Sequence, residues 1–220
     1  MVRSLAVVST LLHAVGASVI DFEVDGGAKA NDNSWDAVWS NGAALNATLA
    51  KLQPGDTFVV PAKKFYIMGG IQARDLRNVT ISVDGTLEFA STALNALRYI
   101  NAWPRKGNGN VYECIQFVNF TNVRFTSATE GTLDGSGAKW WGIPGIGYLQ
   151  RQENRPRLLV ISHSSDILVE RLFFKGVQRG LDLWLGLLFT RRLSFLLRLL
   201  LAAVAGCCGW LLWLVLRLRL

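Results

Sequence analysis

The chain of 220 residues has few of the residue types on which disulfide-rich folds and metal sites depend: three cysteines, two histidines and five prolines. Cys114 stands alone and Cys207 and Cys208 are adjacent, so the sequence has neither a disulfide framework nor a zinc or Cys-x-x-Cys redox motif. Because Cys114 directly precedes Ile115 and has no neighbouring histidine, we predict a small buried packing residue there rather than a nucleophile.

A basic stripe is also absent, although the formal net charge is +7. Residues 18–175 contain 16 Lys and Arg against 15 Asp and Glu, whereas residues 176–220 contain six against one. The central part of the chain is therefore near neutral, and it has no basic run interleaved with aromatic residues. We expect no nucleic-acid partner.

Residues 1–17 have the composition of a secretory signal peptide. Arg3 lies in a short basic start, an apolar stretch follows to Ala14, and small residues occupy positions 15–17. The apolar stretch is too short to span a bilayer. We expect a secreted, extracellular protein.

A pattern of apolar residues and Asn or Asp recurs every 44 positions. The three copies are Ile71, Leu76, Asn78, Val79 and Ile81; Ile115, Phe120, Asn122, Val123 and Phe125; and Leu159, Ser164, Asp166, Ile167 and Val169. Such a period indicates a stacked solenoid, and β-branched and aromatic residues favour strands over helices in it. We predict an all-β fold, a parallel β-helix in which Asn78, Asn122 and Asp166 stack as a ladder.

Other elements are predicted around these copies. Apolar residues at steps of three and four over residues 34–52 predict an amphipathic helix that caps the first repeat, with Asn33-Ser34 as its start and Pro54 after its end. Strands are expected at residues 57–60 and 65–68. Long loops are expected at residues 91–111 and 135–157, where binding surfaces of solenoids are usually built.

Several of these segments together resemble a known family. Residues 131–141 read Gly-Thr-Leu-Asp-Gly-Ser-Gly-Ala-Lys-Trp-Trp, residues 154–159 Asn-Arg-Pro-Arg-Leu-Leu, and residues 165–170 Ser-Asp-Ile-Leu-Val-Glu. With Gly-Ala-Lys at 27–29 and Gly-Asp-Thr-Phe-Val-Val-Pro at 55–61, residues 20–175 are similar to the N-terminal part of polygalacturonases of glycoside hydrolase family 28. The resemblance implies a right-handed pectin-lyase-like β-helix that hydrolyses α-1,4-galacturonan with inversion, with aspartates and without a metal or cofactor.

The family's catalytic motifs are missing from the sequence. The resemblance implies an Asn-x-Asp turn, an Asp-Asp pair, a Gly-His-Gly and an Arg-x-Lys after the segment that ends at Lys175, and none of them occurs. His163 matches in neither context nor order. We therefore assign no catalytic residue and expect a glycosidase-family chain that does not hydrolyse pectin.

The remaining candidates have ordinary structural interpretations. Asp134 precedes Gly135 as a turn residue and the repeat places no second carboxylate beside it, and Asp84 and Glu130 precede Gly-Thr-Leu segments in the same way. Trp140 and Trp141 are candidates for stacking on a sugar ring, although such a pair more often closes a loop onto a solenoid.

Three sequons mark Asn46, Asn78 and Asn119 as acceptors for N-linked glycans. Asn78 also occupies a ladder position, where a stacked side chain leaves no room for a glycan. We therefore expect Asn46 to be the best acceptor.

Residues 176–220 differ from everything before them. Seventeen leucines and five arginines fall in residues 181–220, and residues 199–216 form an uncharged apolar run of 18 residues. We predict a helical apolar tail, about 27 Å over that run, which is near the minimum for a membrane span. Two origins remain open: a membrane anchor, and aberrant translation of intron or shifted-frame DNA, which we favour because the break falls inside a repeat.

Two functional hypotheses follow. The first is a truncated or mispredicted polygalacturonase-family protein that faces a pectic or other uronic-acid polysaccharide. The second is a non-catalytic, membrane-anchored carbohydrate-binding or interaction protein, in which the tail provides the membrane contact.

Overall fold

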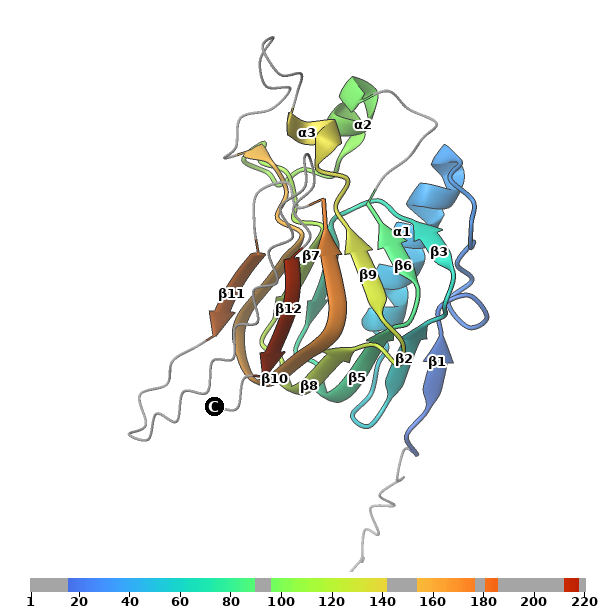
Figure 1. Ribbon diagram of the computed structural model, residues 1–220, viewed down its shortest axis with the longest axis vertical. Helices are drawn as coiled ribbons and strands as arrows, with labels where there is room; N and C mark the ends of the chain where they lie inside the picture. Colours follow the sequence, from blue (N-terminus) through green and yellow to red (C-terminus); the bar gives the residue numbers. More distant parts are fainter. Residues whose placement is uncertain (1–15, 90–95, 142–153, 177–180, 186–211, 218–220) are drawn as a thin grey trace, which may run out of the picture.

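The computed structural model describes residues 16–89, 96–141, 154–176, 181–185 and 212–217, which are mostly strands (Figure 1). The strands are β1 (Val19–Asp21), β2 (Thr57–Val60), β3 (Lys64–Tyr66), β4 (Ile71–Arg74), β5 (Arg77–Val83), β6 (Thr86–Glu88), β7 (Ile115–Val118), β8 (Thr121–Thr126), β9 (Gly131–Asp134), β10 (Leu159–Lys175), β11 (Leu181–Leu185) and β12 (Leu212–Arg217). The helices are α1 (Trp35–Leu49), α2 (Ala96–Ala102) and α3 (Ala138–Trp141).

Parallel pairing dominates the sheet. Every described pairing between named strands is parallel except that of β12 with β10. This large parallel sheet is compatible with the predicted β-solenoid.

The 44-residue spacing is the register of two sets of strands. In the first set, Ile71 of β4 lies beside Ile115 of β7, which lies beside Leu159 of β10. In the second set, β5, β8 and β10 align in the same way, with Val123 between Val79 and Ile167. The prediction that corresponding residues of the three copies stack is confirmed.

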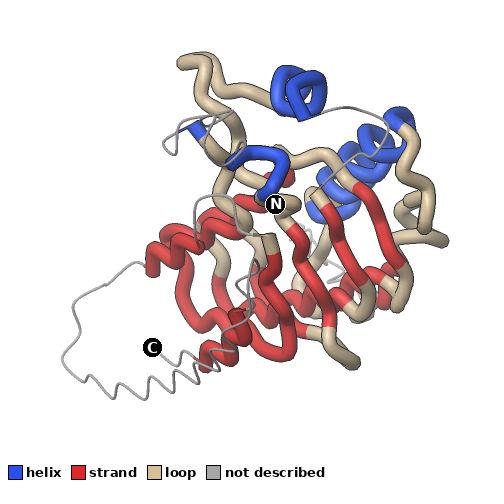
Figure 2. Tube along the Cα trace, turned by 45° about the horizontal axis from the view of Figure 1, so that its top comes forward, coloured by secondary structure: helices blue, strands red, loops and turns tan. Residues whose placement is uncertain are grey.

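A single strand, β10, joins three faces of the structure. Its residues 159–162 pair with β7, residues 165–169 with β8, and residues 172–175 with β9. The strand bends sharply at His163, Asp166 and Arg171, where φ is 53°, 52° and 59°. Figure 2 shows the strands stacked side by side across this part of the molecule.

The corner between the first two faces is built from two ladders of left-handed residues. The predicted ladder has φ of 53° at Asn78, 54° at Asn122 and 52° at Asp166, and a second ladder has 59° at Asp75, 59° at Asn119 and 53° at His163. Asn and Asp tolerate this conformation better than other residues with a Cβ. The Asn122 amide donates to Asn78 Oδ1 at 3.0 Å, and the Asn119 amide donates to Asp75. These side-chain hydrogen bonds link the corner of one copy to the same corner of the next.

Between the ladders, Ser164 replaces the apolar residues Leu76 and Phe120 and is equally buried, with 2% of its surface exposed. Its hydroxyl accepts from the Phe120 N–H at 3.0 Å and donates to the Ser162 carbonyl at 2.9 Å. The polar side chain is thus paired on both sides, which makes a hydroxyl acceptable inside the core.

Replacing Ser164 by alanine is expected to lower the free energy of unfolding by about 1–3 kcal/mol, because the buried Phe120 N–H loses its acceptor. Urea denaturation measures this loss. The control is Ser165→Ala, at an exposed neighbouring position, which is expected to change stability by less than about 0.5 kcal/mol. Equal effects of the two substitutions would contradict the role assigned to the hydroxyl.

The third face departs from the 44-residue spacing. Leu87 of β6 lies beside Leu133 of β9, 46 positions later, and Gly131 of β9 lies beside Leu172 of β10, 41 positions later. The turns that lead into this face differ in length from one copy to the next. In the third face, buried residues such as Leu87 and Leu133 still lie side by side, but the number of residues between paired positions is no longer 44.

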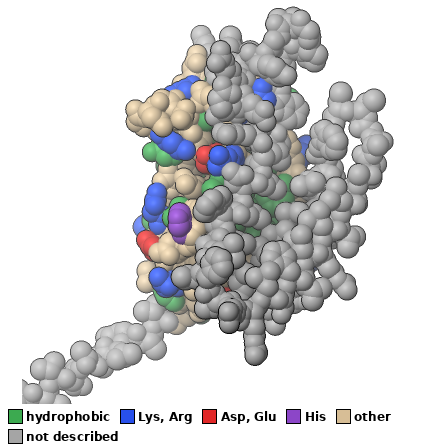
Figure 3. All heavy atoms as spheres, turned by 90° about the vertical axis from the view of Figure 1, so that its left-hand side faces the viewer, with side chains coloured by type: hydrophobic (Ala, Val, Ile, Leu, Met, Phe, Trp, Pro, Cys, Tyr) green, Lys and Arg blue, Asp and Glu red, His purple; other side chains and the backbone are tan. Residues whose placement is uncertain are grey.

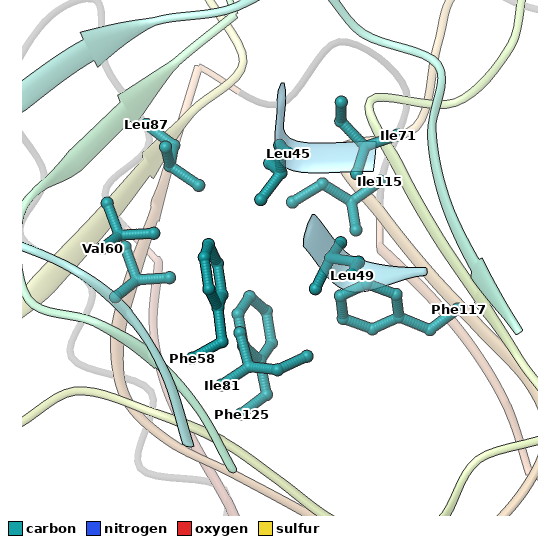
Figure 4. A pocket seen from close by; sticks show the side chains of 11 residues that line it. Leu45, Leu49, Phe58, Val60, Ile71, Ile81, Leu87, Ile115, Phe117 and Phe125 are labelled. Carbon is teal, nitrogen blue, oxygen red and sulfur yellow. The ribbon is translucent and has the colours of Figure 1, made fainter. Parts of the chain in front are cut away.

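Helix α1 covers the core at the end where the first copy lies. Its N-cap is Ser34, whose side chain accepts from the Ala37 N–H at 3.3 Å, close to the predicted start. Leu45 and Leu49 point toward core residues such as Phe58 (Figure 4). The predicted cap is therefore present, and it ends at Leu49 rather than at Leu52.

Three other predictions change in detail. The strand expected at residues 65–68 is β3, which ends at Tyr66, after which the Met68 N–H donates to the Val38 carbonyl of α1. The two expected loops contain the short helices α2 and α3. Residues 1–15 of the expected signal peptide lie outside the described residues.

The predicted helical tail is wrong where the structure describes it. Residues 181–185 form β11 and residues 212–217 form β12, and both pair with β10. The last strand of a sheet has unpaired N–H and C=O groups, and pairing with them outweighs the helix preference of leucine-rich sequence. Among the described residues, no helix is long and apolar enough to cross a membrane. Most of the run 199–216 lies outside the described residues.

Candidate functional site

The outer face of strands β3, β6, β9 and β10 carries a row of polar side chains, here called the charged row. Its members are Tyr66, Glu88, Asp134 and Lys175, which the strand register places side by side. In each strand the preceding residue points into the core: Phe65, Leu87, Leu133 and Phe174 are buried. The alternation of side chains along a strand therefore directs the charged row away from the core, although Asp134 is covered and only 8% exposed.

Each carboxylate of the charged row is neutralised by a lysine. Lys64 Nζ lies 2.5 Å from Glu88 Oε2, and Lys175 Nζ lies 3.1 Å from Asp134 Oδ2. The hydrogen bond with Glu88 raises the pKa of Lys64, which keeps that ammonium charged. Two adjacent carboxylates are thus tolerated because a cation flanks each of them.

The loop after β9 closes over one end of the charged row. Asp134 Oδ1 accepts from the Ser136 N–H at 2.9 Å, and the Ser136 hydroxyl lies 3.5 Å from Glu88 Oε1. Lys139 of α3 lies over the Tyr99 ring, with Nζ 5.1 Å from its centroid, and burial lowers the pKa of this lysine while Glu88 opposes the shift. A third ammonium therefore stands near Glu88.

The neighbouring Glu88 corrects the interpretation of Asp134. The sequence repeat placed no second carboxylate beside Asp134, whereas the structure pairs it directly with Glu88 on β6. The 46-residue offset of this face concealed the pair, because a search 44 positions before Asp134 arrives at Ala90. The sequence signal for this pair is the similarity of residues 85–88, Gly-Thr-Leu-Glu, to residues 131–134, Gly-Thr-Leu-Asp, which aligns Glu88 with Asp134.

The geometry suits binding better than proton transfer. Inverting hydrolysis needs a protonated acid and a carboxylate base on opposite sides of the sugar, roughly 6.5–9.5 Å apart. Glu88 and Asp134 lie on adjacent parallel strands, whose spacing is about 4.8 Å, and each is held in an ion pair. Of the two carboxylates, Glu88 stays partly exposed as a hydrogen-bond acceptor, whereas Asp134 is buried within its ion pair and its bond to the Ser136 N–H.

Trp140 lies inside an aromatic cluster that attaches α3 to α2. Its surface is 0% exposed, and its ring packs edge-on against Trp103, with centroids 5.2 Å apart, and against Tyr99 at 6.3 Å. Its indole nitrogen is buried and has no hydrogen-bond partner. In this arrangement Trp140 offers no exposed ring to a sugar, as the loop-closing interpretation expects. The Trp141 side chain lies outside the described residues.

Close packing at Gly69 supports the same cluster. A Cβ at Gly69 would lie 2.0 Å from Cζ2 of Trp103, so only glycine admits the indole. The Trp103 nitrogen donates to the Tyr112 carbonyl at 2.8 Å. Burial raises the pKa of Tyr99 well above its ordinary value, and its hydroxyl donates to the Phe89 carbonyl. The cluster is structural.

The other sequence candidates lie at turns. Asp84 Oδ1 accepts from the Ser82 hydroxyl at 2.8 Å and the Ala128 N–H at 2.6 Å, which joins two copies at a corner, and Glu130 is exposed. His163 belongs to the second left-handed ladder and is exposed. Figure 3 shows a face of the molecule on which charged side chains and a histidine lie at the surface. The structure brings neither Asp84 nor His163 to the charged row.

Cys114 is completely buried, as predicted. Within the described ranges, no group of three or more His, Cys, Asp or Glu side chains is placed to hold a metal ion.

The three sequon asparagines differ in how their side chains bond. Asn46 is half-buried, and its amide nitrogen donates to the Gly70 carbonyl at 3.3 Å while Oδ1 accepts from the Gln72 N–H at 2.8 Å. Asn119 uses its amide nitrogen toward Asp75. Asn78 is exposed and bonds through Oδ1. Because a glycan is attached to the amide nitrogen, the geometry favours Asn78 over Asn46, the reverse of the sequence-based preference.

Comparison with known proteins adds no relative to this picture. No protein-family model matches the chain, and neither a curated protein nor a solved structure matches it.

Proposed function

We propose that residues 18–175 are the N-terminal part of a right-handed parallel β-helix of the polygalacturonase type, and that the charged row binds an acidic polysaccharide without hydrolysing it. The family assignment is supported by the motifs of residues 131–141, 154–159 and 165–170. The observation that carries the binding role is the charged row, whose member Asp134 ends β9 at the family-like Asp134-Gly135 segment.

Charge and shape suit a uronic-acid polymer. Lys64, Lys139 and Lys175 supply three ammonium groups against the two carboxylates of Glu88 and Asp134, which leaves an excess of one positive charge. Carboxylates of the polymer compete with Glu88 for the exposed Lys64 ammonium group and contact that of Lys175, while sugar hydroxyls donate to the partly exposed Glu88 carboxylate. Half-exposed Tyr66, with Lys64 Nζ 4.7 Å from its ring centroid, extends the surface by one strand.

Purified full-length chain is expected to bind polygalacturonate and to release no reducing ends from it. The double variant Lys64→Gln/Lys175→Gln is expected to bind about five- to tenfold more weakly, because it removes two exposed charge contacts of up to about 1 kcal/mol each. Affinity electrophoresis measures binding, and Lys51→Gln, at an exposed lysine after α1, is the matched control. Equal affinities of the three proteins would contradict the assigned surface.

Hydrolysis is tested on the same preparations. Asp134→Asn, Glu88→Gln and Asp84→Asn each remove one carboxylate while conserving shape. Robust release of reducing ends that any of these substitutions abolishes would show that a catalytic site is present, and would overturn the proposed non-hydrolytic role.

The competing hypothesis, a membrane-anchored binding protein, uses the same surface and differs in the tail. Sequencing of transcripts across the codons for Lys175 and Gly176 separates the two. Reads that continue from Lys175 into a frame with the missing aspartate motifs support the polygalacturonase-type protein. Uninterrupted reads through Leu220 support the natural tail.

A further inference from the structure

The carboxylate of Asp56 is buried without a cation beside it. Asp56 directly precedes β2 and is 4% exposed. Its Oδ2 accepts from the Gln53 N–H at 2.7 Å, and its Oδ1 accepts from the Ser18 N–H at 3.0 Å. Among the described residues, no lysine or arginine forms an ion pair with Asp56. Because buried charged groups in proteins are normally paired with an opposite charge, this carboxylate lacks a counter-ion.

Ser18 holds its place at the start of the fold through both sides of its backbone. Its nitrogen bonds to Asp56, and its carbonyl accepts from the Thr57 N–H at 2.8 Å. Residues 16–18 are exposed, and the pairing of β1 with β2 begins only at Val19. A chain that began at Ser18 would therefore keep the whole pairing of β1.

We propose that the peptide bond between Ala17 and Ser18 is a processing site, and that the α-ammonium group of the processed chain is the counter-ion of Asp56. The proposal rests on the predicted signal peptide, whose small residues at 15–17 end at this bond, and it is independent of the proposed carbohydrate binding.

The chemistry is hydrolysis by a signal peptidase of the secretory pathway. The C–N bond between Ala17 and Ser18 breaks, the oxygen of water enters the new Ala17 carboxylate, and both protons of water go to the Ser18 nitrogen. A neutral N–H that already points at Asp56 Oδ1 thus becomes an ammonium group at the same position. A charge-assisted hydrogen bond is stronger than the neutral bond it replaces.

The new ion pair would attach the short strand β1 to the first repeat copy. The Asp56 carbonyl accepts from the Thr80 N–H at 3.0 Å, and the Gly55 N–H donates to the Asn78 carbonyl at 2.7 Å. Asp56 therefore belongs to a turn that is bonded to β5. Because β1 has only three residues, a stronger bond at its first end stabilises the edge of the sheet.

The first test locates the cleavage. The full-length chain is expressed in a secreting eukaryotic host, and its product is sequenced from the N-terminus, whether it accumulates in the medium or in the cells. The expected sequence is Ser-Val-Ile-Asp-Phe, residues 18–22. Another first residue, or a product that retains Met1, would overturn the assigned bond.

The second test measures the ion pair. Two chains that both end at Leu220 are compared by urea denaturation: the processed chain that begins at Ser18, and a chain that begins at Gly16 and so carries its ammonium group two residues away. The unfolding equilibrium constant of the processed chain is expected to be about tenfold smaller. In the Asp56→Asn background this difference is expected to fall below about twofold, because no carboxylate remains to attract the ammonium group.

Glu130→Gln is the matched control, since it removes an exposed carboxylate and is expected to leave the tenfold difference intact. A difference that persists in Asp56→Asn, or that is absent with Asp56 in place, would refute the ion pair. If Asp56→Asn does not fold, Nα-acetylation of Ser18 decides, because it restores a neutral amide at the same nitrogen. Loss of the tenfold difference on acetylation supports the ion pair, and an unchanged difference refutes it.

Discussion

Replacing Gly131 by alanine is expected to lower the free energy of unfolding by about 3 kcal/mol or more, one of the two largest effects that we expect in this molecule. A Cβ at this position would lie 1.8 Å from the Val83 carbonyl oxygen and 3.1 Å from Leu172 Cδ2. The closest atom belongs to the backbone at the end of β5, which cannot move without breaking its own pairing with β2. Chemical denaturation followed by circular dichroism gives the change.

Gly107→Ala is the matched control for this substitution, because a Cβ at Gly107 would meet nothing within 4 Å. Its effect is expected to stay within about 0.5 kcal/mol. If Gly131→Ala were as mild as Gly107→Ala, the close approach of β9 to the Val83 carbonyl would not exist in solution.

Replacing Phe125 by alanine is expected to lower the free energy of unfolding by about 3–5 kcal/mol, because the core keeps the space that the ring leaves. Phe125 is 2% exposed, its ring centroid lies 5.5 Å from that of Phe117, and it stands near Phe58 and Ile81 in the core beneath α1 (Figure 4). Urea denaturation measures the loss. If the slope of the unfolding free energy against urea concentration stays the same, the variant exposes as much surface on unfolding as the wild type does.

Phe173→Ala removes the same ring from the outer side of β10, where the residue is half-buried. It is expected to cost clearly less than Phe125→Ala, because less apolar surface returns to water. A larger loss at Phe173 than at Phe125 would contradict the assignment of inward and outward faces in this part of the sheet.

The sequence predicted the first two faces well because their connecting corner has constant length. In each copy the corner contains two left-handed residues three positions apart, such as Asn119 and Asn122. Because the corner has the same number of residues in every copy, residues 44 positions apart in the sequence lie side by side in the sheet. The N-cap Ser34 likewise located the start of α1, because capping is a local property of the chain.

The strand register of the third face and the strand conformation of the tail could not be predicted from the sequence pattern. Turns of different length before β6, β9 and the end of β10 change the offset between partners, so the repeat hid the contact of Glu88 with Asp134. The strand conformation of residues 212–217 depends on the edge of β10, a tertiary partner that composition does not reveal. The aromatic cluster of Trp103 and Trp140 joins two loops whose contact no local signal announces.

The position of α1 ahead of the three repeat copies has a consequence for synthesis on the ribosome. Helix α1 is translated before the strands of the first full copy. The far end of the stack is therefore already covered by α1 when the later copies emerge. The nascent chain then exposes one growing edge at a time, and every new strand finds its partner about 44 residues behind it. Because each copy contacts only the copies next to it in the stack, we expect stepwise folding from the N-terminal end, which leaves few unpaired strands open to neighbouring chains at any one time.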